Sequence, residues 1–183
     1  TTRLVGSEMC IRDRAKRLEV STKSASRCFD ELEYLNIDVL GMKGKSRVIN
    51  IPSDRKQVWQ QIENVLRNPV IRRFVLREDM KLEKKAGISA LCEYSLLSDN
   101  VYPTYAVTKK ELKDSAVKVE KQVSELEEIG CVVLELGYFI DFLGKGFQDP
   151  LSVILSLTGE EQEEERVDIS INEMLEEYVW SKD

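Results

Sequence analysis

The sequence contains no histidine. Histidine is the commonest zinc ligand and general base, and Ser-His-Asp and Cys-His arrangements require it. The four cysteines, at positions 10, 28, 92 and 131, lie too far apart for a CxxC clip. These absences argue against a serine, cysteine or zinc hydrolase and leave carboxylate-and-magnesium chemistry open.

Long apolar runs are also missing. The most apolar window, Cys131 to Ile140, is interrupted by Glu135 and Gly137, and no stretch approaches the roughly 18 residues that span a bilayer. No basic start, apolar middle and small-residue cleavage site of a secretory signal is visible. The composition, 42% apolar and 33% charged, is typical of a globular chain, and we expect a cytoplasmic protein without a membrane segment.

The net charge of −6 is distributed unevenly along the 183 residues. Residues 1–56 hold 12 Lys and Arg against 8 Asp and Glu, whereas residues 57–183 hold 15 against 25. This difference favours a nucleic-acid-facing head on an acidic body, although small segments vary by several charges without any function.

The first residues need separate treatment. The run Val5–Arg14, VGSEMCIRDR, resembles a translated sequencing-adapter remnant that recurs at the ends of metagenomic open reading frames. We therefore expect residues 1–14 to be non-native and the native protein to begin near Ala15.

The following segment carries two short amphipathic patterns joined by a turn. Ala15 and Leu18 share one side of a first helix, and Ser21 is a natural N-cap for a second. In the second helix Ala25, Phe29 and Leu32 recur at i, i+4 and i+7, with Cys28 and Leu35 beside them, which predicts one buried apolar stripe. Two helices joined by so short a turn must cross steeply, which is the geometry of a DNA-binding helix-turn-helix.

The start of the second helix would lie in the major groove. Arg27 is suited to a bidentate guanine contact, and Lys23 is suited to phosphate. An alternative is that these are merely solvated residues of a surface helix. The candidate DNA-binding residues of this helix are Ser21, Thr22, Lys23, Ser24, Ser26 and Arg27.

A β-hairpin is predicted next. Residues 38–40 and 47–51 resemble two short strands, and Gly41, Lys43, Gly44 and Lys45 between them supply turn chemistry and charge. A hairpin directly after a recognition helix is a wing, although a basic hairpin tip alone can be a plain soluble turn. The candidate phosphate-binding residues of the tip are Lys43, Lys45, Ser46 and Arg47.

These residues support a family resemblance. VSTKSASRCFDELEYLNI followed by GKSRVI resembles the MarR-like winged helix-turn-helix transcriptional regulators. The resemblance implies a bacterial regulator that binds double-stranded DNA. The helix that normally precedes Ala15 is missing or replaced, so the winged helix is truncated. A homodimer is expected because one recognition helix reads few base pairs.

Residues 53–183 predict an acidic body of mixed α/β structure. Helices are expected from Ser53 to Arg67, over 70–76, over 88–97 and after the cap residues Thr108, Asp149 and Thr158. Strands are expected over 102–107 and 131–140, where β-branched and aromatic residues gather. The acidic run Glu160–Arg166 is interpreted as the solvated first turns of a helix.

The body also suggests a second function. GISALCEYSLLSDNVYPTYAV and the segment from DPLSVILSL to the end resemble uncharacterised bacterial winged-helix proteins, which are similar in plan to abortive-infection antitoxins. This looser resemblance implies an autoregulatory antitoxin with a nucleotidyltransferase toxin as partner. A third alternative is a protein-interaction module without DNA binding.

Enzyme signatures are weak. Glu135 is followed by Leu136 and Gly137, so the acid-x-lysine pattern of a restriction-type nuclease fails. FLGKGFQD, at 142–149, lacks the P-loop spacing and the Ser or Thr after its lysine.

We therefore predict an α+β protein that is not an enzyme and has no cofactor, metal or catalytic residues. Its expected parts are a non-native segment at 1–14, a winged helix-turn-helix at 15–52 and a body at 53–183 for dimerisation, sensing or partner binding.

Overall fold

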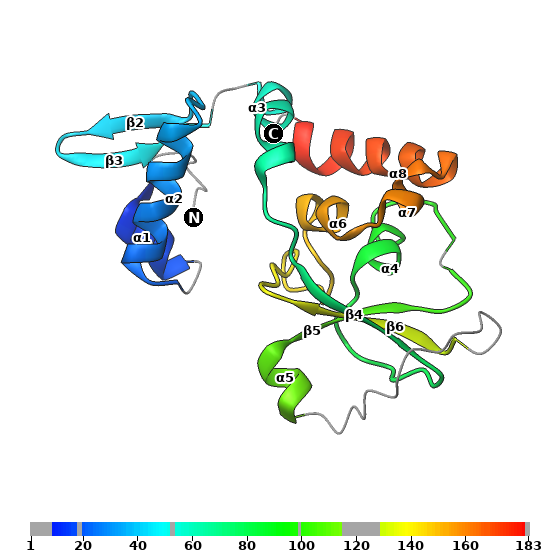
Figure 1. The fold of residues 1–183 in the computed structure, drawn as a ribbon. Coiled ribbons are helices and arrows are strands. Elements are labelled where there is room, and N and C mark those ends of the chain that lie inside the picture. Colours follow the sequence, from blue (N-terminus) through cyan, green and yellow to red (C-terminus); the bar gives the residue numbers. More distant parts are fainter. Residues whose placement is uncertain (1–8, 18–19, 52–53, 99, 115–128, 182–183) are drawn as a thin grey trace. The chain divides into compact units, whose positions relative to one another are not determined.

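The structure, a computed structural model, describes residues 9–17, 20–51, 54–98, 100–114 and 129–181. These residues are mixed α/β, with helices and two three-stranded sheets, which confirms the coarse α+β expectation. The chain divides into two compact units, Thr1–Leu66 and Arg67–Asp183 (Figure 1). None of the described helices is long and apolar enough to cross a membrane.

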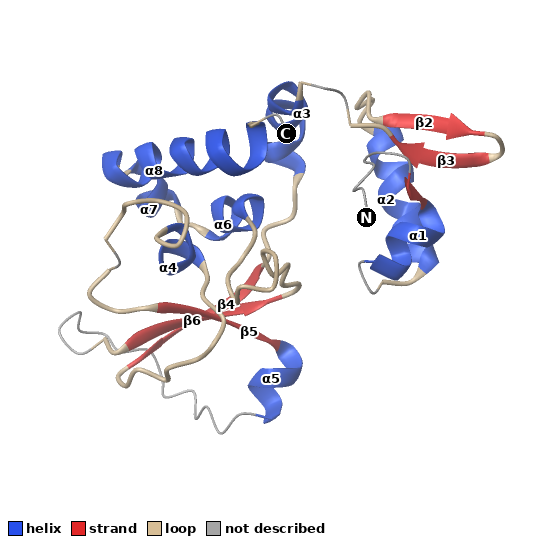
Figure 2. Cartoon of the chain, turned by 180° about the vertical axis from the view of Figure 1, so that it is seen from behind, coloured by secondary structure: helices blue, strands red, loops and turns tan. Residues whose placement is uncertain are grey.

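The N-terminal unit combines two helices with a small antiparallel sheet. Its order is β1 (Met9–Cys10), α1 (Ile11–Arg17), α2 (Thr22–Tyr34), β2 (Leu40–Lys43) and β3 (Ser46–Ile49). Strand β3 is central, with β1 on one side and the hairpin partner β2 on the other (Figure 2). Both β1 and the start of α1 lie inside the segment that the sequence suggested to be non-native.

The core of this unit follows the predicted stripe of α2 only in part, since Leu32 is half-buried and Cys28 and Leu35 are exposed. Ala25 and Phe29 are buried, with exposed fractions of 6% and 1%, and Ala15 of α1 and Val48 of β3 are buried too. Helix α2 ends at Tyr34, and Asn36 takes the left-handed conformation (φ 54°) that commonly terminates helices. The helix α3 (Arg55–Ile62) and a 3₁₀ turn (Glu63–Val65) complete the unit.

Helix α3 is shorter than the sequence suggested. Asp54 is its N-cap and accepts a hydrogen bond from the Gln57 amide at 3.0 Å; the predicted cap, Ser53, lies outside the described residues. The helix buries Trp59 and ends at Ile62, well before Arg67.

The second unit is built on a mixed sheet. Its strand order is β4 (Val70–Leu76), β6 (Cys131–Leu136) and β5 (Thr104–Thr108), with β6 antiparallel to β4 and parallel to β5. The helices α4 (Gly87–Leu91), α6 (Pro150–Ser156), α7 (Gly159–Glu163) and α8 (Glu165–Leu175) cover one face. Helix α5 (Lys109–Asp114) lies on the opposite side (Figure 1).

The predicted helix over 70–76 is wrong, because this segment is strand β4. A β-bulge between Val70 and Arg72 shifts the register against β6. The bulge interrupts strict alternation, so the apolar residues fall at spacings that also suit a helix. Beyond the bulge, Arg72 faces Glu135, Phe74 faces Val133 and Leu76 faces Cys131 across the ladder.

The predicted helix caps Asp149 and Thr158 are confirmed, and the predicted strands are present with bounds that differ from the expected ones. Asp149 caps α6, and Thr158 and Glu161 form a capping box on α7.

The expected single final helix is wrong, since Glu164 is extended (ψ 121°) and separates α7 from α8. Like charges four residues apart in the run of glutamates disfavour continuous helix there. The helix expected over 88–97 ends at Leu91, and the strand expected over 131–140 ends at Leu136.

A buried glutamine ties the loop before α6 to the helices α4 and α6. Gln148 is fully buried; its Oε1 accepts a hydrogen bond from the Gly87 amide at 3.0 Å, and its Nε2 donates to Ser156 Oγ at 3.0 Å. The Tyr94 hydroxyl donates to the Gln148 carbonyl oxygen at 2.5 Å. These bonds connect the loop before α6 with the start of α4 and the end of α6.

We predict that Gln148→Met destabilises the protein by about 1–3 kcal/mol, because it leaves the buried Gly87 amide without its acceptor and removes the bond to Ser156. Chemical denaturation measures the loss. Gln60→Met, on the exposed surface of α3, is the control and should change the free energy of unfolding little. Equal effects of the two substitutions would contradict the role given to Gln148.

A second prediction concerns Glu161, which accepts a hydrogen bond from Arg73 at 2.9 Å. Burial alone would raise the pKa of Glu161, but the bonds from Arg73 and Thr158 and the charge of Arg73 outweigh it and lower the pKa. A lowered folded-state pKa stabilises the fold above the unfolded carboxyl pKa of about 4.3, and this stabilisation is lost as the pH falls through the folded value.

Glu161→Gln should therefore be less stable than wild type at neutral pH, and the difference should shrink below about pH 4. Denaturation at several pH values tests this, with the exposed Glu163→Gln as control. A difference that stays constant down to pH 3 would contradict the assignment.

Candidate nucleic-acid interface

The first turns of α2 present the predicted polar face to solvent. Ser21 is the N-cap, and its Oγ accepts a hydrogen bond from the Ser24 amide at 3.0 Å. Ser26 is partly buried. The exposed predicted residues are Ser21, Thr22, Lys23, Ser24 and Arg27. Since Ala25 and Phe29 are buried, the helix separates an apolar face from a cationic, hydroxyl-bearing face.

The hairpin has a shorter turn than the sequence suggested, and its strands are Leu40–Lys43 and Ser46–Ile49 instead of 38–40 and 47–51. Lys43 pairs with Ser46, which leaves Gly44 and Lys45 as a two-residue turn. Gly44 has a positive φ of 61°, and glycine at the first position favours the type II′ turn that suits twisted strands. Gly41 lies within β2 and not in the turn, and a Cβ there would meet the Asn50 side chain at 2.4 Å.

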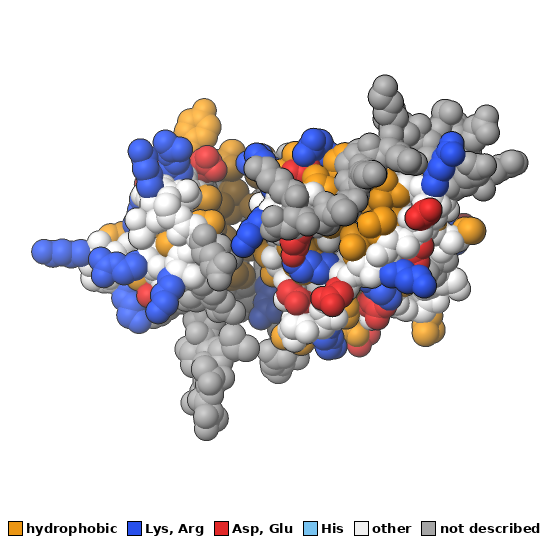
Figure 3. Space-filling model, turned by 90° about the horizontal axis from the view of Figure 1, so that it is seen from below, with side chains coloured by type: hydrophobic (Ala, Val, Ile, Leu, Met, Phe, Trp, Pro, Cys, Tyr) orange, Lys and Arg blue, Asp and Glu red, His pale blue; other side chains and the backbone are white. Residues whose placement is uncertain are grey.

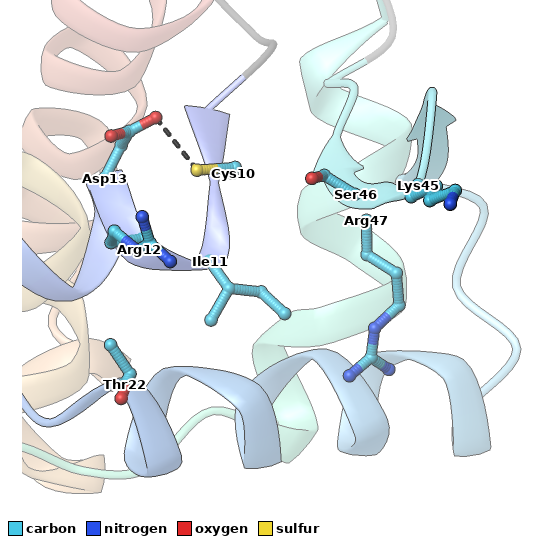
Figure 4. Close-up of a pocket in the computed structure, with 8 residues that line it drawn as sticks. All are labelled: Cys10, Ile11, Arg12, Asp13, Thr22, Lys45, Ser46 and Arg47. Carbon is cyan, nitrogen blue, oxygen red and sulfur yellow. Dashed lines mark hydrogen bonds between the residues drawn. The ribbon is translucent and has the colours of Figure 1, made fainter.

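The side chains of the hairpin tip divide into two groups. Lys43, Lys45 and Ser46 are exposed. Arg47 is partly buried, and Figure 4 shows it pointing from the hairpin toward α2. Three predicted residues of the tip are therefore exposed to solvent, while the fourth, Arg47, contacts side chains of α2.

Arg47 makes a connected set of contacts with α2. Its Nη1 lies 2.6 Å from Asp30 Oδ1 and 3.3 Å from Glu33 Oε2. Its Nη2 donates to Ser26 Oγ at 3.3 Å, and its guanidinium carbon lies 5.8 Å from the centroid of the Phe29 ring. The hydrogen bond to Asp30, and then the charges of Asp30 and Glu33, raise the pKa of Arg47 despite partial desolvation.

An open pocket of about 570 Å³ joins the helix start to the hairpin. Thr22 of α2 and Lys45, Ser46 and Arg47 of the hairpin all line it (Figure 4). The structure thus brings residues from both predicted segments to one concave surface. Lys23, Ser24, Ser26, Arg27 and Lys43 do not line this pocket.

The same pocket is also lined by residues of the segment 1–14, which the sequence predicts to be non-native. They are Cys10, Ile11, Arg12 and Asp13, from β1 and the start of α1. Cys10 Sγ donates to Asp13 Oδ2 at 3.0 Å, and Arg12 is exposed. Because residues 1–14 resemble an adapter remnant, the sequence did not predict Arg12 as part of a site, and no motif in this segment marks it as one.

The N-terminal unit carries many cations, but its helix α2 carries charges of both signs. Figure 3 shows Lys and Arg side chains gathered on this unit, at the left of that view. The start of α2 carries Lys23 and Arg27, whereas its second half carries Asp30, Glu31 and Glu33. Arg47 lies against two of these three carboxylates.

The described residues contain no group of three or more Cys, Asp or Glu side chains placed to hold a metal ion. Comparisons of the chain with models of known protein families, with curated proteins and with solved structures gave no match.

We predict that Ser21→Ala destabilises the N-terminal unit by about 1 kcal/mol, because the orphan Ser24 amide at the start of α2 loses its acceptor. Ser21→Asp keeps an acceptor oxygen and should retain most of the stability. Thermal unfolding followed by circular dichroism compares the two variants. Losses of equal size would show that the cap is not the source of the effect.

Proposed function

We propose that the protein is a sequence-specific DNA-binding transcriptional regulator, and that the N-terminal unit serves as a winged helix-turn-helix. The order of helix, turn, helix and hairpin supports this, and so does the exposed polar start of α2. The observation that carries the proposal is that α2 and the hairpin tip line one concave surface that includes Thr22, Lys45 and Ser46.

In the proposed complex, the start of α2 enters the major groove. The guanidinium of Arg27 can donate two hydrogen bonds to a guanine edge, and Lys23 lies one turn earlier, where it can reach a phosphate. The hydroxyls of Thr22 and Ser24 are short enough to approach the groove wall closely. These side chains are exposed, so contact with DNA would not require the core to rearrange.

The hairpin then serves as a wing beside the groove. Lys45 and Ser46 stand at its tip, and Lys43 is paired with Ser46 across the turn. Cations and a hydroxyl suit the sugar-phosphate backbone, which fixes position without reading sequence.

The charge distribution supports the same assignment. Residues 1–56 have an excess of four cations and residues 57–183 an excess of ten anions. An acidic body repels phosphate, so this distribution would direct DNA to the N-terminal unit. We propose that the body mediates homodimerisation or partner binding, since two half-sites multiply the specificity of a short recognition helix.

The experiment that tests the function is fluorescence anisotropy of the protein on duplex DNA from upstream of its own gene. A scrambled duplex is titrated in parallel across a salt series. Tighter binding to the upstream duplex, with affinity falling steeply as salt rises, would support a sequence-specific regulator. Equal and weak binding to both duplexes would contradict it and favour a protein-interaction module.

We predict that Lys23→Glu combined with Arg27→Glu lowers affinity for the upstream duplex at least about 100-fold, because two groove-facing cations become anions. Lys109→Glu with Lys110→Glu is the matched control, since it makes the same charge change on exposed residues of α5. Wild-type affinity in the α2 variant would exclude α2 as the recognition helix. Equal losses in both variants would show only a nonspecific effect of net charge.

A further inference from the structure

The second half of α2 poses a problem for any helix that approaches a phosphate backbone. Asp30 and Glu33 are exposed, with side-chain exposed fractions of 61% and 69%, and Glu31 lies between them. Carboxylates beside a groove repel phosphate and weaken binding. A helix with this sequence needs a compensating charge next to its acidic half.

Arg47 is placed to supply that charge. It reaches both Asp30 and Glu33 through one guanidinium nitrogen, and its side chain is only 28% exposed. It also lies over the Phe29 ring, so packing as well as charge holds it in position. An arginine that has to satisfy two carboxylates is a poor candidate for a new phosphate contact.

Ser26 strengthens this assignment. Its Oγ accepts a hydrogen bond from the second terminal nitrogen of Arg47, and the residue is partly buried. Arg47 therefore binds α2 at three side chains that span two helical turns: Ser26, Asp30 and Glu33. Such a contact fixes the direction of β3 relative to α2 and hence the place of Lys45 beside the helix start.

We propose that Arg47 is a positioning residue for DNA binding: it neutralises the acidic half of α2 and holds the hairpin against the helix, and it does not itself contact phosphate. This inference rests on the proposed function. It replaces the phosphate contact expected for Arg47 from sequence and leaves that contact to Lys45 and Lys43.

The test is a double-mutant cycle in the full chain, built from Arg47→Gln and the isosteric pair Asp30→Asn with Glu33→Gln. Anisotropy on the upstream duplex is measured over a salt series for wild type, each variant and their combination. The pair of amides removes the negative charge but keeps oxygen acceptors for Arg47. Lys45→Gln is the control for a residue that does contact phosphate.

We expect Arg47→Gln to weaken binding about ten-fold in the wild-type background, because Asp30 and Glu33 are left uncompensated. In the amide background the same substitution should weaken binding less, because no uncompensated carboxylates remain and only the attachment of the hairpin is lost. The slope of log K against log salt concentration should stay unchanged. Lys45→Gln should lower the slope by about 0.9 in both backgrounds. A salt slope lowered in magnitude by about 0.9 in the amide background would overturn the proposal by showing that Arg47 contacts phosphate. An undiminished loss of affinity there would overturn the neutralising role.

A second readout separates this inference from the proposed function. Hydrogen exchange of the β3 amides, measured without DNA, should be faster in Arg47→Gln, because the hairpin loses its attachment to α2. Unchanged exchange would overturn the positioning role even if DNA binds. If wild type binds no DNA while exchange is still faster in Arg47→Gln, the proposed function fails and the α2–hairpin attachment stands.

If Arg47→Gln does not fold, Arg47→Met, which retains the aliphatic stem over Phe29, replaces it in both measurements.

Discussion

Burial of the Phe29 ring is the constraint on which the N-terminal unit depends. The ring is 1% exposed, and Ala25 one turn earlier is buried with it. Once this face of α2 turns inward, Lys23 and Arg27 must face solvent, because they lie on the opposite side of a helix with 3.6 residues per turn. Arg47 lies over the same ring from the hairpin. One aromatic residue therefore determines both which side chains are exposed and where the hairpin attaches.

The charges of α2 are arranged along its axis as well as around it. Its first half is cationic and its second half is acidic, and Arg47 lies against the acidic half. Exposed ion pairs of this kind contribute little to stability, since water and salt screen them. Their importance is in geometry, because a planar guanidinium with several donors orients the strand that carries it. A lysine at this position could neutralise one carboxylate but could not also reach Ser26 in the same fixed arrangement.

The second unit depends on buried polar groups within its helical layer and within its sheet. Gln148 connects α4 and α6, and Glu135, 1% exposed in the central strand β6, pairs with Arg72 of β4 at 2.5 Å. A buried carboxylate that lost this partner would be left unpaired, so the pair specifies the β4–β6 register more than it adds stability. The bulge next to Arg72 lets β4 place this side chain opposite Glu135.

The sequence alone determined the local features whose causes are local. Ser21, Asp149 and Thr158 cap helices because a side-chain oxygen lies next to orphan amides, and the spacing of Ala25 and Phe29 defines the buried face of α2. Tertiary structure decided the rest. Val70–Leu76 is a strand because β6 offers a pairing partner, which its own apolar spacing does not reveal. Arg47 turns toward α2 because two carboxylates 14 and 17 residues away come within reach only after the hairpin folds. Such long-range contacts depend on the whole chain path, and for that reason the path had to be known before the role of Arg47 could be assigned.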